Sequence, residues 1–159
     1  MPTAEKTNAM RVLDRAKVRY QVHNYSSERH SAEEVAALVG VPPEVVFKTL
    51  VVILPAGKPL LAIIPGNHEL DLKKVASLFG QKKAHMASLS EAEALTGLQV
   101  GGISALALMN KGFRVAIHTS ATQHEQVLVS AGVRGTNLAL EPADLIRVIN
   151  AQVADLTVI

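Results

Sequence analysis

The chain has 159 residues, 48% of them hydrophobic, with 16 Lys and Arg residues against 14 Asp and Glu residues. This length fits one domain over residues 1–159, and the apolar share suffices for a sizeable aliphatic core. The absence of cysteine excludes disulfides and thiolate nucleophiles, and 3% aromatic residues argue against a surface that stacks nucleobases. No apolar stretch has the length of a membrane span and residues 1–15 contain no apolar signal core. We therefore expect a cytoplasmic protein without a membrane or DNA partner.

Hydrophobic spacing divides the chain into short helices and strands. In the first half it predicts a helix over 4–17, a strand over 18–25, a helix between Ser31 and Gly40, strands over 45–54 and 60–64, a helix between Asp71 and Gly80, and an edge strand over 81–86. In the second half it predicts a helix between Ser90 and Gly97, strands over 113–117, 127–130 and 138–140, a helical segment over 120–125, and a last helix that begins at Pro142.

Local signals mark several of the helix starts. Ser31 with Glu34, and Ser90 with Glu93, have the spacing of a capping box, in which each side chain bonds the backbone amide of the other residue. Asp71 precedes a third helix as an N-cap. Helices mixed with strands of hairpin and crossover type indicate an α+β domain, with a mixed, mostly antiparallel central sheet surrounded by helices. The strand order does not follow from these patterns.

A lysine interrupts the most apolar strand. The run over 45–54 is hydrophobic except for Lys48 and Thr49. Burying an unpaired ammonium costs several kcal/mol, so Lys48 either reaches solvent at the end of the strand or faces a polar pocket that takes an anionic or carbonyl group. Residue statistics alone favour the first of these two interpretations.

Familiar catalytic motifs are missing. None of the six histidines stands three or four residues from another, and without cysteine we expect no metal site and no cofactor. Ser104 lacks the glycine two residues later that a nucleophile elbow requires. The glycines at 101–102 and 132–135 either direct backbone amides at a developing oxyanion or form ordinary turns. Tyr25 either lines a pocket or covers the core.

Five segments occur together in an order that resembles a known family. They are His23-Asn-Tyr25, Val46-Phe-Lys-Thr-Leu50, Leu70-Asp-Leu-Lys-Lys-Val-Ala76, Val100-Gly-Gly-Ile-Ser104 and Val129-Ser-Ala-Gly-Val-Arg-Gly135. Their order and spacing are similar to those of the YbaK-type proteins, free-standing aminoacyl-tRNA deacylases related to the editing domain of bacterial prolyl-tRNA synthetases. The resemblance covers nearly the whole chain.

The resemblance implies trans-editing, the hydrolysis of the ester that joins a wrong amino acid to the tRNA 3′ end. The implied substrate is a mischarged aminoacyl-tRNA, and the first candidate is Cys-tRNA(Pro) or tRNA-Pro with a similar small amino acid. Prolyl-tRNA synthetase is a further candidate partner. Lys48 matches the pocket lysine, whose ammonium would bind the terminal adenosine phosphate or hold the acylated end in line, and the backbone around Gly101 and Gly102 would line the pocket against the carbonyl. The matching substrate-binding positions are Tyr25, Thr49, Ile103, Ser104, Ser130, Gly132, Gly135 and Asn137. No side chain is an obvious general base, so water or a substrate thiol would attack.

Three positions depart from the family pattern. Ala105 replaces a common proline, Ala131 a glycine, and Asn137 an aspartate that is common in cysteine-editing members. Losing that carboxylate removes a charge that could orient the substrate ammonium. The alternatives to an enzyme are therefore a non-catalytic module that binds a tRNA acceptor end or a synthetase, and a small-molecule binding protein with the same fold.

Overall fold

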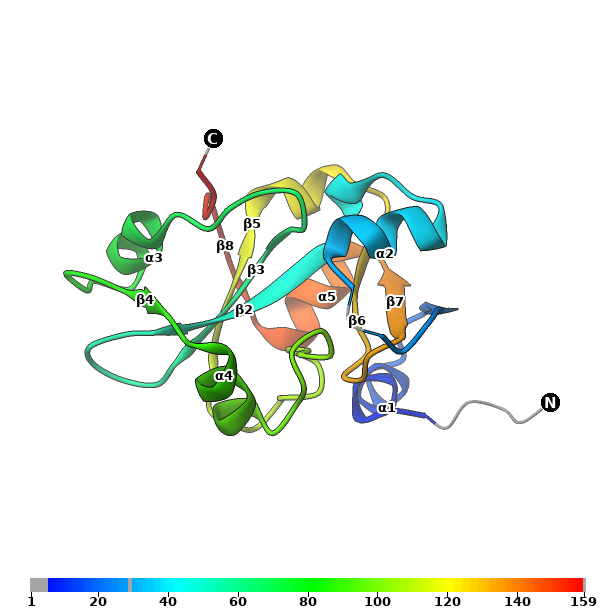
Figure 1. The fold of residues 1–159 in the computed structure, drawn as a ribbon, viewed down its shortest axis with the longest axis horizontal. Coiled ribbons are helices and arrows are strands. Elements are labelled where there is room, and N and C mark those ends of the chain that lie inside the picture. Colours follow the sequence, from blue (N-terminus) through cyan, green and yellow to red (C-terminus); the bar gives the residue numbers. More distant parts are fainter. Residues whose placement is uncertain (1–5, 29, 159) are drawn as a thin grey trace.

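A computed structural model of the chain describes residues 6–28 and 30–158, which fold into two β-sheets with helices packed around them (Figure 1). The α-helices of these residues are α1 (Asn8–Arg15), α2 (Ala32–Val39), α3 (Leu72–Leu78), α4 (Leu89–Thr96) and α5 (Pro142–Ile149), with 3₁₀ turns η1 (Pro43–Val45) and η2 (Thr119–Gln123). The strands are β1 (Gln21–Asn24), β2 (Phe47–Ile53), β3 (Leu60–Pro65), β4 (His85–Met86), β5 (Arg114–His118), β6 (Val127–Ser130), β7 (Thr136–Leu140) and β8 (Gln152–Ala154).

The larger sheet has the order β4-β2-β3-β5-β8, and the smaller one the order β1-β7-β6. β3 pairs with β5 and β5 with β8 in parallel, whereas the other strand pairs are antiparallel. A single parallel bridge between Val46 and Leu128 joins the two sheets. The predicted α+β class with mixed, mostly antiparallel pairing is confirmed, and the strands divide into two sheets that meet beside β2.

The buried strand β3 separates two apolar clusters. Its alternate residues Leu61 and Ile63 face a large cluster that also contains α1 and α5 side chains, while Leu60, Ala62 and Ile64 face a second cluster beneath α3. A third, small cluster packs α2 against Val46 and the smaller sheet. Helix α2 therefore lies over the junction of the two sheets. Within the described residues, no helix combines the length and apolarity that crossing a bilayer requires.

Several predicted boundaries differ from the structure. The strand predicted over 18–25 spans Gln21–Asn24, and the edge strand predicted over 81–86 is only His85–Met86. The first helix begins at Asn8 after the N-cap Thr7, and positions 4 and 5 of the predicted helix lie outside the described residues. β8 was not predicted, because its pairing with β5 is parallel and depends on residues far away in the sequence.

The capping-box prediction was right for α2 and wrong by two residues for α4. Ser31 and Glu34 form the box at α2, but at α4 the pair is Ser88 and Glu91 rather than Ser90 and Glu93. Both pairs match the spacing, so the sequence motif does not choose between them. Glu93 instead accepts a hydrogen bond from the Val100 amide at 2.9 Å, which fastens α4 to the glycine loop that follows.

We predict that Ser88→Ala lowers the free energy of unfolding by about 1 kcal/mol, because it removes the side-chain acceptor of the Glu91 amide. The matched control Ser90→Ala, two residues away on the same helix, should stay within about 0.5 kcal/mol of wild type. Urea unfolding followed by circular dichroism measures both. Equal losses in the two variants would contradict the assignment of the cap.

Candidate active site

A cavity of about 400 Å³ opens where α2, β2, β6 and β7 meet the loop that follows α4. It brings together segments from across the sequence. Its lining residues are Tyr25, His30, Ser31, Ala32, Glu34, Val35, Val46, Phe47, Lys48, Thr49, Leu50, Val100, Gly101, Ile103, Ser130 and Asn137. The sequence-predicted residues Tyr25, Lys48, Thr49, Gly101, Ile103, Ser130 and Asn137 are among them.

The cavity exists because one edge of β2 is only partly covered. β6 approaches this edge through the bridge at Val46, and β4 pairs with it only at Val52 and Ile53. In an antiparallel pair, backbone groups of successive residues point to opposite edges. The Gly66 amide on the β3 side donates to the Val46 carbonyl, and the Val51 carbonyl accepts from Ala87 on the other side. The same alternation directs the amide and carbonyl of Thr49 at the uncovered edge, beside the cavity.

Lys48 is held by a backbone carbonyl and not by a carboxylate. Its Nζ donates a hydrogen bond to the Gly66 carbonyl at 3.2 Å, and its side chain is partly buried. Burial lowers the pKa of Lys48, and the negative charges of Glu33 and Glu69 oppose that shift. Of the two interpretations of Lys48, the structure favours the pocket. The ammonium lies in the cavity lining, and its charge is not cancelled by an ion pair among the described residues.

Gly66 is a residue of the site that the sequence analysis did not single out. A Cβ at Gly66 would lie 2.1 Å from the Cβ of Ala32 in α2 and 2.9 Å from the Val46 carbonyl oxygen. Only glycine lets the chain pass between α2 and β2 here. Because its φ is not positive, no turn motif betrays this requirement in the sequence.

The far wall of the cavity is polar but uncharged. The Asn137 side-chain amide donates to the Tyr25 hydroxyl, and Asn137 is 5% exposed. Burial raises the pKa of Tyr25, so its hydroxyl stays neutral at physiological pH. The His30 ring lies edge-on to the Tyr25 ring, with centroids 5.8 Å apart. His30 was not predicted as a site residue, and its Nε2 is buried without a hydrogen-bond partner among the described residues.

The lining carboxylate of Glu34 is occupied by structure. It accepts the Ser31 amide in the capping box at 3.0 Å and lies 3.9 Å from His30 Nδ1. Hydrogen bonds from Ser31 lower the pKa of Glu34, so its carboxylate stays charged, accepts hydrogen bonds and is a weak base. Among the described residues, no cluster of three or more His, Asp or Glu side chains is arranged to hold a metal ion. The site therefore offers the Lys48 cation, the Glu34 carboxylate engaged in the capping box, further polar side chains and backbone groups.

Comparison with known proteins identifies this architecture. The model of the aminoacyl-tRNA editing domain family matches residues 26–148. A candidate Cys-tRNA(Pro)/Cys-tRNA(Cys) deacylase of Enterococcus faecalis is 42% identical over 157 residues, which cover 98% of this chain and 95% of that protein. The chain belongs to the aminoacyl-tRNA editing domain family.

Other members extend the comparison. A proline–tRNA ligase of Nitratidesulfovibrio vulgaris is 38% identical over 72 residues, which are 45% of this chain and 12% of the ligase. A solved structure described as a candidate trans-editing enzyme for prolyl-tRNA synthetase superposes with a TM-score of 0.81 at 25% identity and covers 99% of both chains. A second solved structure, of a hypothetical protein, has a TM-score of 0.87 at 24% identity over 95% of this chain and supports the fold.

Four other predicted residues of the editing domain do not line the cavity but fix the parts that do. The Gly102 amide donates to the Gln99 carbonyl at 2.8 Å, and a Cβ there would lie 3.0 Å from the backbone of the loop at 133–134. Ser104 accepts the Ala107 amide in a buried turn. Gly132 donates to the Ser130 hydroxyl, and the Gly135 carbonyl accepts the Tyr25 amide at 2.9 Å. Gly101 is the member of the glycine pair that borders the cavity.

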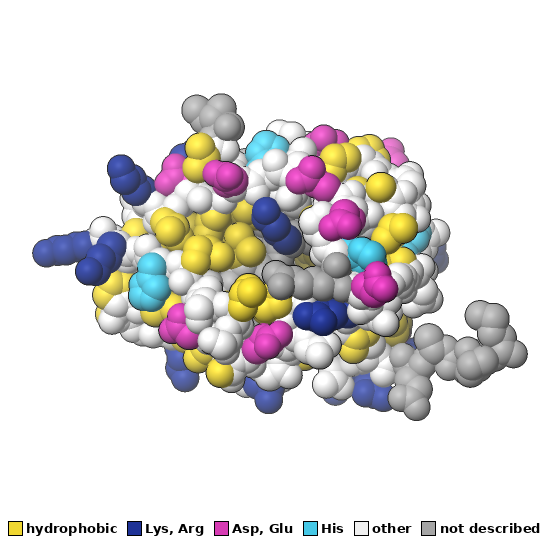
Figure 2. Space-filling model, viewed as in Figure 1, with side chains coloured by type: hydrophobic (Ala, Val, Ile, Leu, Met, Phe, Trp, Pro, Cys, Tyr) yellow, Lys and Arg dark blue, Asp and Glu magenta, His cyan; other side chains and the backbone are white. Residues whose placement is uncertain are grey.

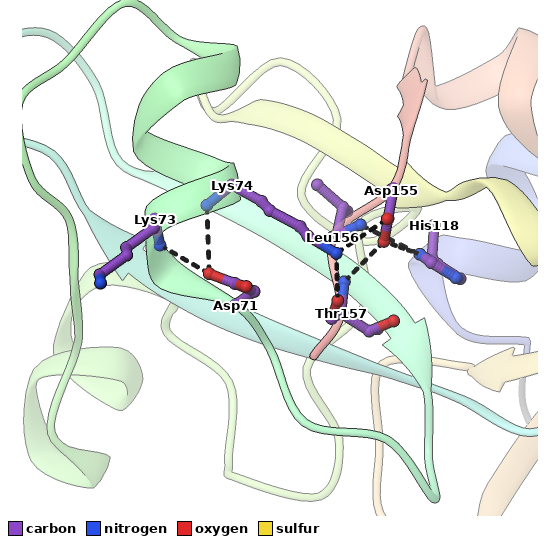
Figure 3. A network of polar contacts seen from close by, with 7 residues as sticks. All are labelled: Asp71, Lys73, Lys74, His118, Asp155, Leu156 and Thr157. Carbon is purple, nitrogen blue, oxygen red and sulfur yellow. Dashed lines mark hydrogen bonds and ion pairs between the residues drawn. The ribbon is translucent and has the colours of Figure 1, made fainter. Parts of the chain in front are cut away.

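The C-terminal segment secures the loop that carries Gly66. The Asp71 amide donates to the Leu156 carbonyl at 2.8 Å, and Lys74 Nζ bonds both the Asp155 carboxylate and the Thr157 carbonyl at 2.8 Å (Figure 3). His118 Nδ1 accepts the Leu156 amide at 3.0 Å. This network, defined as Asp71, Lys74, His118, Asp155, Leu156 and Thr157, holds the α3 end of the loop that carries Gly66.

The network makes a prediction about pH. Burial lowers the pKa of His118, with His68 and Lys74 acting in the same direction and Asp155 against it. At a pH between the pKa values of His118 in the folded and the unfolded chain, the unfolded chain therefore binds more protons. The folded protein has its full stability above the pKa of the unfolded chain and loses stability as the pH falls through the pKa of the folded chain. Unfolding between pH 7 and 5 should show this loss. It should be smaller in His118→Asn, whose amide oxygen accepts the Leu156 amide without titrating, and an identical slope in both proteins contradicts the assignment.

Lys48 should be a stability liability in this fold. Since burial lowers its pKa, the folded state disfavours the charged form, and wild-type stability should rise with pH in the alkaline range just below the ordinary lysine value. We expect the free energy of unfolding of Lys48→Met at pH 7 to equal that of wild type or to exceed it by up to about 1 kcal/mol. The increase of stability with pH in the alkaline range should be absent from this variant. The exposed control Lys111→Met should leave both unchanged. A loss of more than 1 kcal/mol in Lys48→Met means that the lysine is structural.

Proposed function

We propose that this chain is a trans-editing deacylase that hydrolyses the ester between a small, wrongly attached amino acid and the 3′ end of a tRNA. The observation that supports this most is the Lys48 ammonium beside the uncovered backbone of Thr49, in a cavity whose one lining carboxylate, Glu34, is engaged in the capping box. An ammonium that is paired only with a carbonyl can hold a phosphate or the acylated ribose in line, and the backbone groups can bind the amino acid.

The chemistry needs no protein nucleophile. Water adds to the ester carbonyl carbon, the bond to the ribose oxygen breaks, and the free amino acid and the tRNA 3′-hydroxyl leave. Negative charge develops on the carbonyl oxygen, and donors fixed in advance stabilise it without reorganisation. Lys48, the Thr49 amide and the Gly101 backbone are the donors that we assign to this role, since the Gly102 amide is already bonded to Gln99. Tyr25, Ile103, Ser130 and Asn137 would form the amino-acid pocket.

The substrate class follows from the size of the cavity and from the uncharged Asn137 in its wall. Asn137 offers the amino group of a substrate a neutral oxygen where a carboxylate would offer charge, which supports recognition by shape and hydrogen bonds. A Cys-tRNA(Pro) substrate is the first candidate because it is named for the relative from Enterococcus faecalis. The likeness to proline–tRNA ligases supports prolyl-tRNA synthetase as a partner. Cytoplasmic location and the domain limits 1–159 stay predictions.

A non-catalytic tRNA-binding module is the second candidate, and the buried positions weaken it. Ala105 and Ala131, two of the departures from the family pattern, both belong to the main apolar core and not to the cavity lining. These substitutions therefore change packing beneath the site and remove no functional group from it. Asn137 alone changes a side chain of the cavity.

We expect Lys48→Ala to lower kcat/KM for deacylation by at least about 100-fold while the fold is retained, since positioning contributes factors of this size. The assay offers cysteinyl-, alanyl-, seryl- and prolyl-tRNA-Pro to the wild type, Lys48→Ala and the control Lys111→Ala. Release of one amino acid by wild type and control, but not by Lys48→Ala, confirms the enzyme and its specificity. Saturable tRNA binding with only spontaneous release by the wild type favours the binding module.

A further inference from the structure

A segment with four lysines and no acidic residue lies outside the cavity. Residues 72–90 contain Lys73, Lys74, Lys82 and Lys83 and no Asp or Glu. Because the whole chain has 16 basic and 14 acidic residues, acids outnumber bases by two in the remainder. Residues 6–19 are equally basic in sum but contain Asp14, which pairs with Lys6, so the segment of α3, β4 and the turn between them differs in having no acidic residue.

Three of these lysines are available to a partner. Lys74 is used in the network of Figure 3, whereas Lys73, Lys82 and Lys83 are exposed and take part in none of the ion pairs of the described residues. Glu91, the nearest acid after this segment, serves as the capping partner of Ser88. Uncompensated lysines grouped on one surface are typical of proteins that contact phosphates.

The turn that presents Lys82 and Lys83 is anchored. Gln81 Nε2 bonds the Ala56 carbonyl of the β2–β3 hairpin at 3.4 Å, and the Gln81 amide bonds the Ala76 carbonyl at 2.8 Å. Just before it, the Phe79 ring lies under the Arg114 guanidinium, 5.7 Å from the ring centroid. The lysines therefore project from a fixed support, so their position relative to β2 is defined.

An apolar surface connects this turn with the cavity. Figure 2 shows hydrophobic side chains gathered over β2 between α3 and β4, with Lys or Arg side chains at the margin of the patch. The partly buried side chains of the cluster beneath α3 include Leu50, Leu70, Leu72, Leu78, Phe79 and Ala84. Leu50 also lines the cavity, and Met86 of β4 is 39% exposed. The patch is thus continuous from the cavity to β4.

The dimensions suit a short single strand. Met86 lies opposite Val52, four residues along β2 from Lys48, which is about 13 Å at the usual rise of a strand. Lys82 and Lys83 lie just beyond β4. A chain whose last nucleotide occupies the cavity would pass over these aliphatic side chains, which offer apolar contact without stacking, and then bring its phosphates to the lysines.

We propose that this surface, formed by Leu50, Leu72, Met86, Lys73, Lys82 and Lys83, docks the acceptor end of the tRNA. The inference rests on the proposed function and adds the place where RNA outside the reacting ester is held. Phosphate contacts of this kind raise affinity without reading sequence. The surface therefore determines KM for the whole tRNA, while the cavity determines which amino acid is accepted.

The test compares Lys82→Gln/Lys83→Gln with Lys17→Gln/Arg19→Gln, which removes the same charge from exposed residues near α1, at the other end of the molecule (Figure 1). We expect the first variant to raise KM for aminoacyl-tRNA about tenfold and to reduce the slope of log affinity against log salt by about 1.4 to 1.8, since two phosphate contacts are lost. Its kcat, and its hydrolysis of the same amino acid esterified to adenosine alone, should be unchanged. The control should match wild type.

Direct binding of uncharged tRNA keeps this test separate from that of the enzyme. If wild type hydrolyses no ester, weaker binding by the Lys82/Lys83 variant alone still supports the docking surface. Binding and KM equal to those of the control variant overturn it. Normal tRNA binding together with lost binding to prolyl-tRNA synthetase also overturns it, because the surface then serves a protein partner.

Discussion

The close passage of Gly66 between α2 and β2 is the constraint on which the site depends. The Gly66 amide bonds the Val46 carbonyl at 2.7 Å, its missing side chain admits Ala32, and its carbonyl receives Lys48. One residue therefore sets the distance from helix to strand and the position of the ammonium. The chain then continues to Asp71, where the C-terminal segment secures it. A displacement of the backbone at Gly66 would therefore change the position of Lys48 and the distance between α2 and β2 at the same time.

The second constraint is the incomplete pairing of β2. An uncovered strand edge is usually a liability, because its backbone groups invite pairing with another chain. Here the uncovered part is short, lies between β6 and β4, and is enclosed by α2 and the glycine loop. The fold thus keeps the amide and carbonyl of Thr49 available to a small ligand while it hides them from a second protein chain.

The sequence predicts what is local and misses what depends on distant pairing. The Ser31 cap, the Asp71 cap and the buried β3 follow from spacing and hydrophobicity, and they were right. The Ser88 cap competes with an equally good sequence match at Ser90. If Ser90 were the cap, Glu93 would be its capping partner and could not accept the Val100 amide as it does in the structure. The resemblance to a family named seven of the sixteen residues that line the cavity. Gly66 and His30 carry no local motif, because their importance arises from contacts with α2 and Tyr25.

Two lysines in neighbouring elements show how the same side chain serves structure or chemistry. Lys74 is paired with the Asp155 carboxylate, so its charge is neutralised and its effect is to tie α3 to the C-terminal segment. Among residues 6–28 and 30–158, Lys48 bonds a carbonyl and no carboxylate, which fixes its position and leaves its charge unpaired at a cost in stability. An incoming phosphate or developing oxyanion would repay that desolvation cost, whereas a carboxylate beside Lys48 would have removed the reason to bind it. The missing ion pair is therefore what makes Lys48 suited to an anionic substrate.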